Sequence, residues 1–135
     1  MTREELLTEA MAKLNEAIGR GAGVPAYCAM AECQEQKAEQ ASNEVARPLL
    51  LKGIEFCDLA LKLDPESPAA HTARALLLHR LSQRSGGADS RQHIQQGLEQ
   101  ADLALKQRPD WHAAHNARGL LILRQLELGD EAASY

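Results

Sequence analysis

The chain repeats itself at a spacing of 44 residues, from Gly53 to Gly97, and this periodicity limits the folds open to it more than any other feature. Residues 53–80 and 97–124 are identical at 16 of 28 positions. The matching pairs include Glu55 and Glu99, segments 58–62 and 102–106, and Pro65 and Pro109. A repeat of this length is one supersecondary unit, which buries its apolar face by stacking on the next unit. The sequence therefore predicts an array of similar units.

A more divergent third copy lies upstream, where residues 26–31 align with residues 70–75 at the same spacing. Ahead of it, Ala10 and Leu14 align with Gly53 and Cys57 at a spacing of 43 residues, one less than in the other copies. The repetition therefore runs from end to end. Because 135 residues are close to the size of one average domain, we expect a single repeat domain over residues 1–135.

Each unit has the pattern of helices, since apolar residues recur at intervals of three and four, as in Ile54, Cys57 and Leu61. Hydrophobic residues make up 44% of the chain but aromatic residues only 3%, so alanine and leucine must fill the core, which favours close-packed helices over a β-sandwich. Glycine, proline and capping residues divide the chain. We expect an all-α fold of six helices and no strand, at about 2–19, 25–41, 46–63, 68–83, 90–107 and 111–128.

Five residues mark four predicted helix starts. Thr2 and Glu5 form a capping box for the first helix. Pro25 and Pro48 suit the opening turns of the second and third helices, where a missing amide is tolerated. Ser90 is the expected N-cap of the fifth helix.

The joints between units resemble a known family. Residues 60–65, Ala-Leu-Lys-Leu-Asp-Pro, look like the end of one tetratricopeptide repeat and the start of the next, and residues 104–109 repeat the pattern. Residues 126–130 resemble that family's turn within a repeat. The resemblance implies an α-solenoid of about three tetratricopeptide-like hairpins, with the first helix of each hairpin on the concave face.

The chain departs from the family pattern in two ways. Its period is 44 residues instead of about 34, so we expect longer helices or linkers. It also replaces the family's preferred residues at two positions of the first helix: Tyr27, His71 and His115 stand at a Trp-like position, and Met30, Arg74 and Arg118 at a leucine position.

A charged pair is present in both clear copies. If the turn at Pro65 joins two antiparallel helices, Asp58 and Arg74 lie level with each other, eight residues on either side of position 66. Asp102 and Arg118 have the same relation to position 110. We expect two structural ion pairs across the hairpins. The alternative is that Arg74 and Arg118 bind a carboxylate of a partner.

The resemblance also implies a binding surface. The residues expected on the concave face are Glu32, Thr72, Leu76, His79, Arg80, Asn116, Leu120, Leu123 and Arg124. Leucines mixed with hydrogen-bonding and basic groups would suit a peptide or helix of mildly acidic, apolar character. The alternative is that these leucines are buried between repeats.

Charge and hydropathy exclude other partners. Fifteen basic and 19 acidic residues give a net charge of −4, which argues against nucleic acid. No apolar run approaches the roughly 20 residues of a membrane span, and the first residues lack the apolar core of a signal peptide. Three cysteines, an odd number without close spacing, fit a reducing compartment. We expect a cytoplasmic protein that does not bind membranes.

The sequence offers little for catalysis. His112 and His115 share a spacing of three, but tetrahedral zinc needs about four ligands, and no convincing set accompanies them. There is no phosphate loop or nucleophile elbow, and the glycine-rich residues 19–23 follow a helix as a linker. We expect no enzyme activity, metal or cofactor.

The helix predicted at 111–128 is apolar around most of its circumference. Such a helix needs a cover, which self-association, a partner protein or a continuation of a longer chain would provide. The leading hypothesis is a protein-interaction module, an adaptor or chaperone, that binds a peptide or helix in a concave groove. The alternative is an assembly module that forms homo-oligomers or packs on a partner through this helix, including as a piece of a longer repeat protein.

Overall fold

The computed structural model describes the backbone of residues 1–133 and the side chains of residues 1–129. It confirms the predicted all-α class, because that part of the chain forms six helices and no strand. The helices are α1 (Arg3–Gly19), α2 (Val24–Ala38), α3 (Asn43–Leu63), α4 (Pro68–Gln83), α5 (Gly87–Gln107) and α6 (His112–Ala133).

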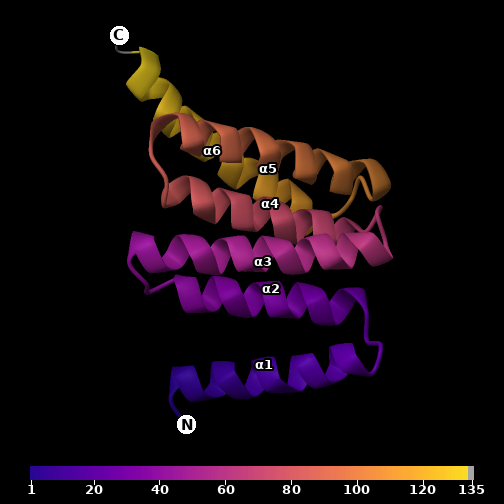
Figure 1. The fold of residues 1–135 in the computed structure, drawn as a ribbon. Coiled ribbons are helices and arrows are strands. Elements are labelled where there is room, and N and C mark those ends of the chain that lie inside the picture. The colour runs from indigo at the N-terminus through magenta and orange to yellow at the C-terminus, as the bar shows by residue number, and fades with distance from the viewer. Residues whose placement is uncertain (134–135) are drawn as a thin grey trace.

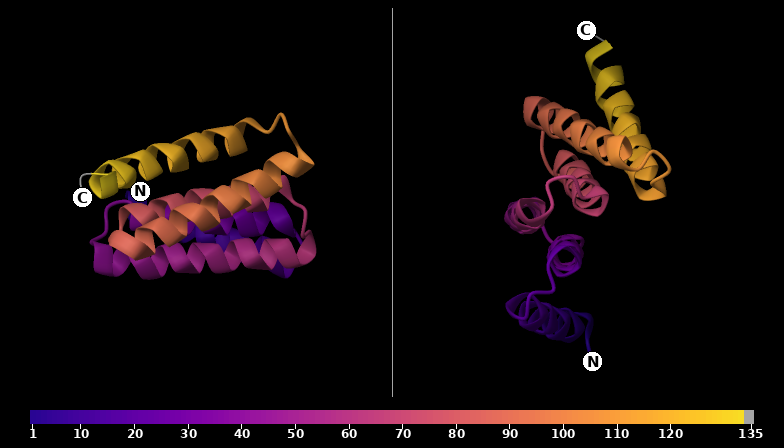
Figure 2. Two further views of the ribbon diagram at one scale, coloured as in Figure 1. Left: turned by 90° about the horizontal axis from the view of Figure 1, so that it is seen from above. Right: turned by 90° about the vertical axis from the view of Figure 1, so that its right-hand side faces the viewer.

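The helices are stacked in the order of the sequence, from α1 at one end to α5 and α6 at the other (Figure 1). Each helix packs against its neighbours in the chain. In addition, α4 contacts both α2 and α6, whereas α1, α3 and α5 make no such contacts with one another in the described residues. Seen along the helix axes, the stack follows a zigzag (Figure 2). The arrangement is a helical solenoid whose even-numbered helices form the inner row.

A glycine at the same point of each repeat lets the helices approach closely. A Cβ atom on Gly53 would lie 3.1 Å from a methyl group of Leu77, and one on Gly97 would lie 2.8 Å from a methyl group of Leu121. Real Cβ atoms essentially never come as close as 2.8 Å, and a contact of 3.1 Å is tighter than nine in ten real ones. The repeated glycine is therefore explained by packing, since it makes room for the repeated leucine.

Two apolar clusters of equivalent residues form the core. The first joins α2, α3 and α4 around Leu50, Cys57 and Leu77, and the second joins α4, α5 and α6 around Ile94, Ala101 and Leu121. Both clusters are rich in alanine, and the small side chains bring the helix backbones close together. The α2–α3 hairpin thus buries apolar residues against α4, and the α4–α5 hairpin buries them against α6.

The structure places the two predicted ion pairs across their hairpins. Arg74 Nε donates to Asp58 Oδ1 at 3.0 Å, and Arg118 Nε donates to Asp102 Oδ1 at 3.1 Å. Both carboxylates are more than half exposed. Pairs this open to water contribute about 0–1 kcal/mol to stability.

A second repeated contact, between α3 or α5 and the end of the next even-numbered helix, was not predicted. Arg47 Nε donates to the carbonyl of Arg84 at 2.7 Å, and Arg91 donates to the carbonyl of Leu128 at 3.4 Å. The two pairs lie 44 residues apart. Arg47 thus satisfies the carbonyl of the C-cap residue of α4, whereas Arg91 bonds a carbonyl inside α6.

Two predicted helix starts are wrong. The third helix begins at Asn43 instead of residue 46, because Ser42 is the N-cap and accepts from Val45 N, and this puts Pro48 inside the helix. The fifth helix begins at Gly87 instead of Ser90. Ser90 does not cap it. Its buried hydroxyl donates to the carbonyl of Ser82, a tertiary contact that propensity rules do not contain.

The helix ends differ at two points. The second helix ends at Ala38 instead of residue 41, where the Arg84 side chain takes up the carbonyls that follow. The sixth helix does not turn at Gly129 and Asp130, as the family pattern implied, but continues to Ala133. The capping box of Thr2 and the place of Pro25 in the first turn of α2 are confirmed.

Candidate functional site

A hollow of about 490 Å³ opens on the inner row of helices, and we call it the inner hollow. Its walls come from α2, α4 and the start of α6, so it spans three successive units. The lining residues are Pro25, Cys28, Ala29, Ala31, Glu32, Glu35, Ala69, Thr72, Ala73, Leu76, Leu77, Trp111 and Ala113. This volume lies within the range of small-molecule sites and also fits a few side chains of a bound segment.

The walls are mainly small and apolar, and the two charged residues among them are both acidic. Glu35 is paired, because it accepts from Arg80 Nε at 3.2 Å. Glu32, one turn earlier on α2, is exposed and has no ion pair in the described part of the chain. The hollow therefore carries one uncompensated carboxylate.

Two polar groups of the lining residues have no hydrogen-bond partner. Thr72 is 4% exposed, and its Oγ1 is buried without a partner. Trp111 is partly buried, and its indole Nε1 is likewise unpartnered. Buried polar groups in proteins are nearly always satisfied, so such atoms are typical of places where a water or a ligand group belongs.

The nine residues predicted for the concave face are distributed over several environments. Glu32, Thr72 and Leu76 line the inner hollow. Arg80 is engaged by Glu35, while His79 is buried.

The predicted residues on α6 lie outside the hollow. Asn116 and Leu123 are exposed, and Leu120 is partly buried. Arg124 holds two helices together, since it donates to the carbonyl of Ser82 at 3.1 Å and to Glu127 at 2.9 Å. Of the predicted residues, those of α2 and α4 contribute most to this site.

Trp111 is one of the lining residues that the sequence pattern did not place at the site. It stands just before α6, and the guanidinium of Arg108 lies 5.2 Å from the ring centroid. The signal that could have indicated it is that Trp111 is the single tryptophan of a chain with few aromatic residues.

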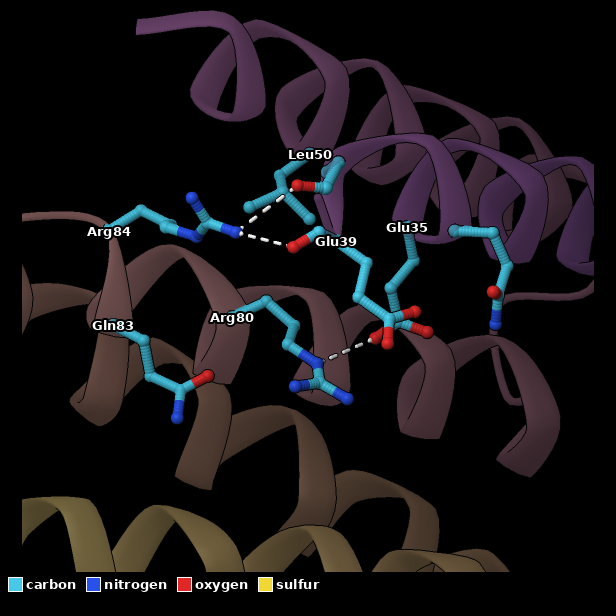
Figure 3. A pocket seen from close by; sticks show the side chains of 8 residues that line it. Glu35, Glu39, Leu50, Arg80, Gln83 and Arg84 are labelled. Atoms are coloured by element: carbon cyan, nitrogen blue, oxygen red, sulfur yellow. Dashed lines mark hydrogen bonds and ion pairs between the residues drawn. The ribbon is translucent and has the colours of Figure 1, made fainter. Parts of the chain in front are cut away.

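A second hollow, of about 90 Å³, lies between the ends of α2 and α4 (Figure 3). Arg84 reaches across it and donates to the carbonyls of Ala38, Glu39 and Ala41 at 3.2, 3.0 and 2.7 Å. The side chain thereby satisfies the free carbonyls of Glu39 and Ala41 just after α2, and it adds a second bond to the carbonyl of Ala38, which also accepts from Ala41 N. Because its donors are already used, this site is a structural cap.

The repeated histidines have a structural place. His71 Nε2 donates to the carbonyl of Pro65 at 2.9 Å, and His115 Nε2 donates to that of Pro109 at 2.8 Å. Each ring closes the turn that precedes its own helix. Within the described residues no three His, Cys, Asp or Glu side chains are grouped as metal ligands would be. No helix in that part of the chain has the length and apolarity to cross a membrane.

The thiols are poor nucleophiles in the fold. Burial raises the pKa of Cys57 to about 12, with smaller contributions in the same direction from Cys28 and Asp58. Burial also raises the pKa of Cys28, which lines the inner hollow. Since the thiolate is the reactive form, neither residue is suited to nucleophilic catalysis.

The site on the inner row is thus a small, mainly apolar hollow with one free carboxylate and two unpartnered polar groups. Compared with known proteins, the chain is similar to none at a significant level: no family model, no curated protein and no solved structure matches it.

Proposed function

We propose that the chain is a tetratricopeptide-like protein-interaction module, an adaptor or chaperone without catalytic activity, which binds a peptide or helix on its inner row of helices. The observation that carries this proposal is the inner hollow, to which α2, α4 and α6 all contribute. A surface built from several stacked units is the kind of site that solenoid proteins use for extended partners.

The lining supports an apolar occupant. Leu76 is partly buried and Ala69 is exposed, so both present apolar surface at the hollow. Side chains of a bound helix or strand would enter such a hollow as anchors, while the rest of the segment follows the helices. The structural roles of Arg80 and Arg124 make the acidic peptide first expected from the sequence less suitable.

Selection from a random peptide library on the purified chain tests the proposal. Peptides that bind the wild type should lose binding to Ala69→Tyr, which fills the hollow from an exposed position, and keep it on Lys62→Tyr, a matched change on the outer helix α3. Failure to enrich any peptide, or equal binding to both variants, would show that the inner hollow is not the recognition surface.

A second candidate function is assembly through α6. Three large apolar residues on this helix are solvent-exposed: Ile122, Leu123 and Leu126, with 43%, 53% and 58% of their surface accessible. The equivalent positions of α4 are Leu78, His79 and Ser82, all of them buried. The comparison favours binding of another protein surface to α6, since neighbouring helices cover the equivalent residues of α4.

The proposed setting is the cytoplasm. Cys28, Cys33 and Cys57 are free thiols in the structure. Such thiols persist in a reducing compartment, where a module of this kind would meet its partner.

A further inference from the structure

The charge of the inner hollow defines the chemistry of its occupant, and this argument rests on the function proposed above. Among the lining residues the ionisable side chains are Glu32, Glu35 and the thiol of Cys28, so none is basic. Two basic residues beside these elements already have ion-pair partners. Arg80 is paired with Glu35, and Arg108, above the Trp111 ring, is paired with Asp110 at 3.7 Å. A bound anion would therefore meet uncompensated negative charge from Glu32.

A second, independent feature points to a ligand. Thr72 lies on α4, opposite the acidic residues of α2, and its hydroxyl is buried without a partner. A hydroxyl can accept a hydrogen bond from an ammonium or guanidinium group, and leaving it unmade costs free energy. A carboxylate on one helix and a hydroxyl on the other suit a cation with an apolar stem.

We infer that the inner hollow recognises a lysine or arginine side chain flanked by apolar residues in the bound segment. The stem of the basic side chain packs on the alanines and Leu76, and its head lies between Glu32 on α2 and Thr72 on α4. The apolar neighbours of the basic residue supply the remaining contact. The positive charge thus provides selectivity and the apolar surface provides most of the affinity.

Three short peptides that share the frame Leu-Ala-X-Leu-Leu, with X as lysine, glutamine or glutamate, test this inference. Binding is followed by the emission of Trp111, the single tryptophan of the chain and a lining residue. The lysine peptide should bind about fivefold more tightly than the glutamine peptide, and the glutamate peptide most weakly. Added salt should reduce the difference.

Matched variants locate the charge that is responsible. Glu32→Gln should abolish the advantage of lysine over glutamine, whereas Glu99→Gln, which changes the net charge equally on the exposed surface of α5, should keep it. Equal binding of the three peptides, no binding by any of them, or an unchanged preference in Glu32→Gln would overturn the inference.

The outcome is separable from that of the library experiment. If the library yields peptides that lose binding to Ala69→Tyr but contain no basic residue, the inner hollow still binds peptides and the inferred preference for a basic residue is wrong. If no library peptide depends on Ala69, the groove function itself fails.

Discussion

Leu121 lies directly over Gly97, so close that a methyl group at Gly97 would be 2.8 Å from its side chain. Gly97→Ala should therefore destabilise the fold by about 1 kcal/mol, because overpacking of a buried leucine outweighs the gain in helix propensity. Gly53→Ala should act in the same direction with a smaller effect, since its contacts begin at 3.1 Å. Urea denaturation measures both.

Gly119 is the control for this pair. It lies within α6, and a Cβ atom on Gly119 would meet no neighbouring side chain or helix within 4 Å. Gly119→Ala should stabilise the protein by about 0.5–1 kcal/mol. Stabilisation by all three alanine variants would contradict the role assigned to the repeated glycine.

The two ion pairs allow a double-mutant cycle in each repeat. Alanine substitutions at Asp58 and Arg74 should show a coupling energy of about 0.2–1 kcal/mol, because the pair is partly exposed. The same cycle at Asp102 and Arg118 should give less, since both side chains there are more exposed. Additive losses in both cycles would mean that the pairs do not interact in solution.

Arg84 should be the most sensitive arginine of the fold. Arg84→Met keeps much of the stem but removes the donors to Ala38, Glu39 and Ala41, and it leaves the carbonyls of Glu39 and Ala41 without a partner. We expect a loss of about 2–3 kcal/mol in urea denaturation. Arg20→Met, on an arginine whose contact is a single exposed ion pair with Glu16, should cost less than about 1 kcal/mol. Equal costs would contradict the capping role.

The free energy of unfolding should decrease as the pH is lowered, because of the titration of His79. Burial lowers the pKa of His79 below its ordinary value of 6.5, and Arg80 and Arg124 act in the same direction. Below pH 6.5 the unfolded chain therefore binds a proton that the folded state excludes, so the free energy of unfolding decreases as the pH falls. His93 adds to this effect, because burial lowers its pKa as well.

Urea midpoints at about pH 7.5 and about pH 5.5 measure this dependence. The variant His79→Gln/His93→Gln should show a smaller change between the two values than the wild type does. His112→Gln, at an exposed histidine, should leave the change as it is. If the double variant shows the same change in urea midpoint as the wild type, these two residues are not the source of the pH dependence.

The exposed residues of α6 predict concentration-dependent association. Light scattering should show a rise in mass with concentration that Leu123→Glu/Leu126→Glu removes. Leu51→Glu/Leu63→Glu, at two exposed leucines of α3, is the matched control. A monomer at all concentrations would dismiss self-association as the cover of this helix.

Periodicity was enough to predict the helices and the ion pairs. The spacing of Asp58 and Arg74 about Pro65 fixes their register in any antiparallel hairpin, so their contact follows from the sequence alone. Helix starts were predicted less well, because local rules gave Ser90 to a cap while a tertiary bond to Ser82 places it inside α5. Propensity does not include such partners.

The site was predicted in part for a similar reason. Glu32, Thr72 and Leu76 could be assigned to the inner row by their place in the repeat. Trp111 could not, since it stands in the turn before α6, where the repeat has serine in its other copy and no helical pattern sets its direction. His79 was misplaced because a polar residue on an apolar helix gives no sign of which side is buried.

The bonds from Arg47 to Arg84 and from Arg91 to Leu128 place the same kind of contact at two successive junctions of the solenoid, one period of 44 residues apart. An additional copy of residues 53–96, inserted after residue 96, would supply both the carbonyl acceptor and the arginine donor that the new junction needs. The length of the array is thus free to vary while the chemistry of its joints stays the same.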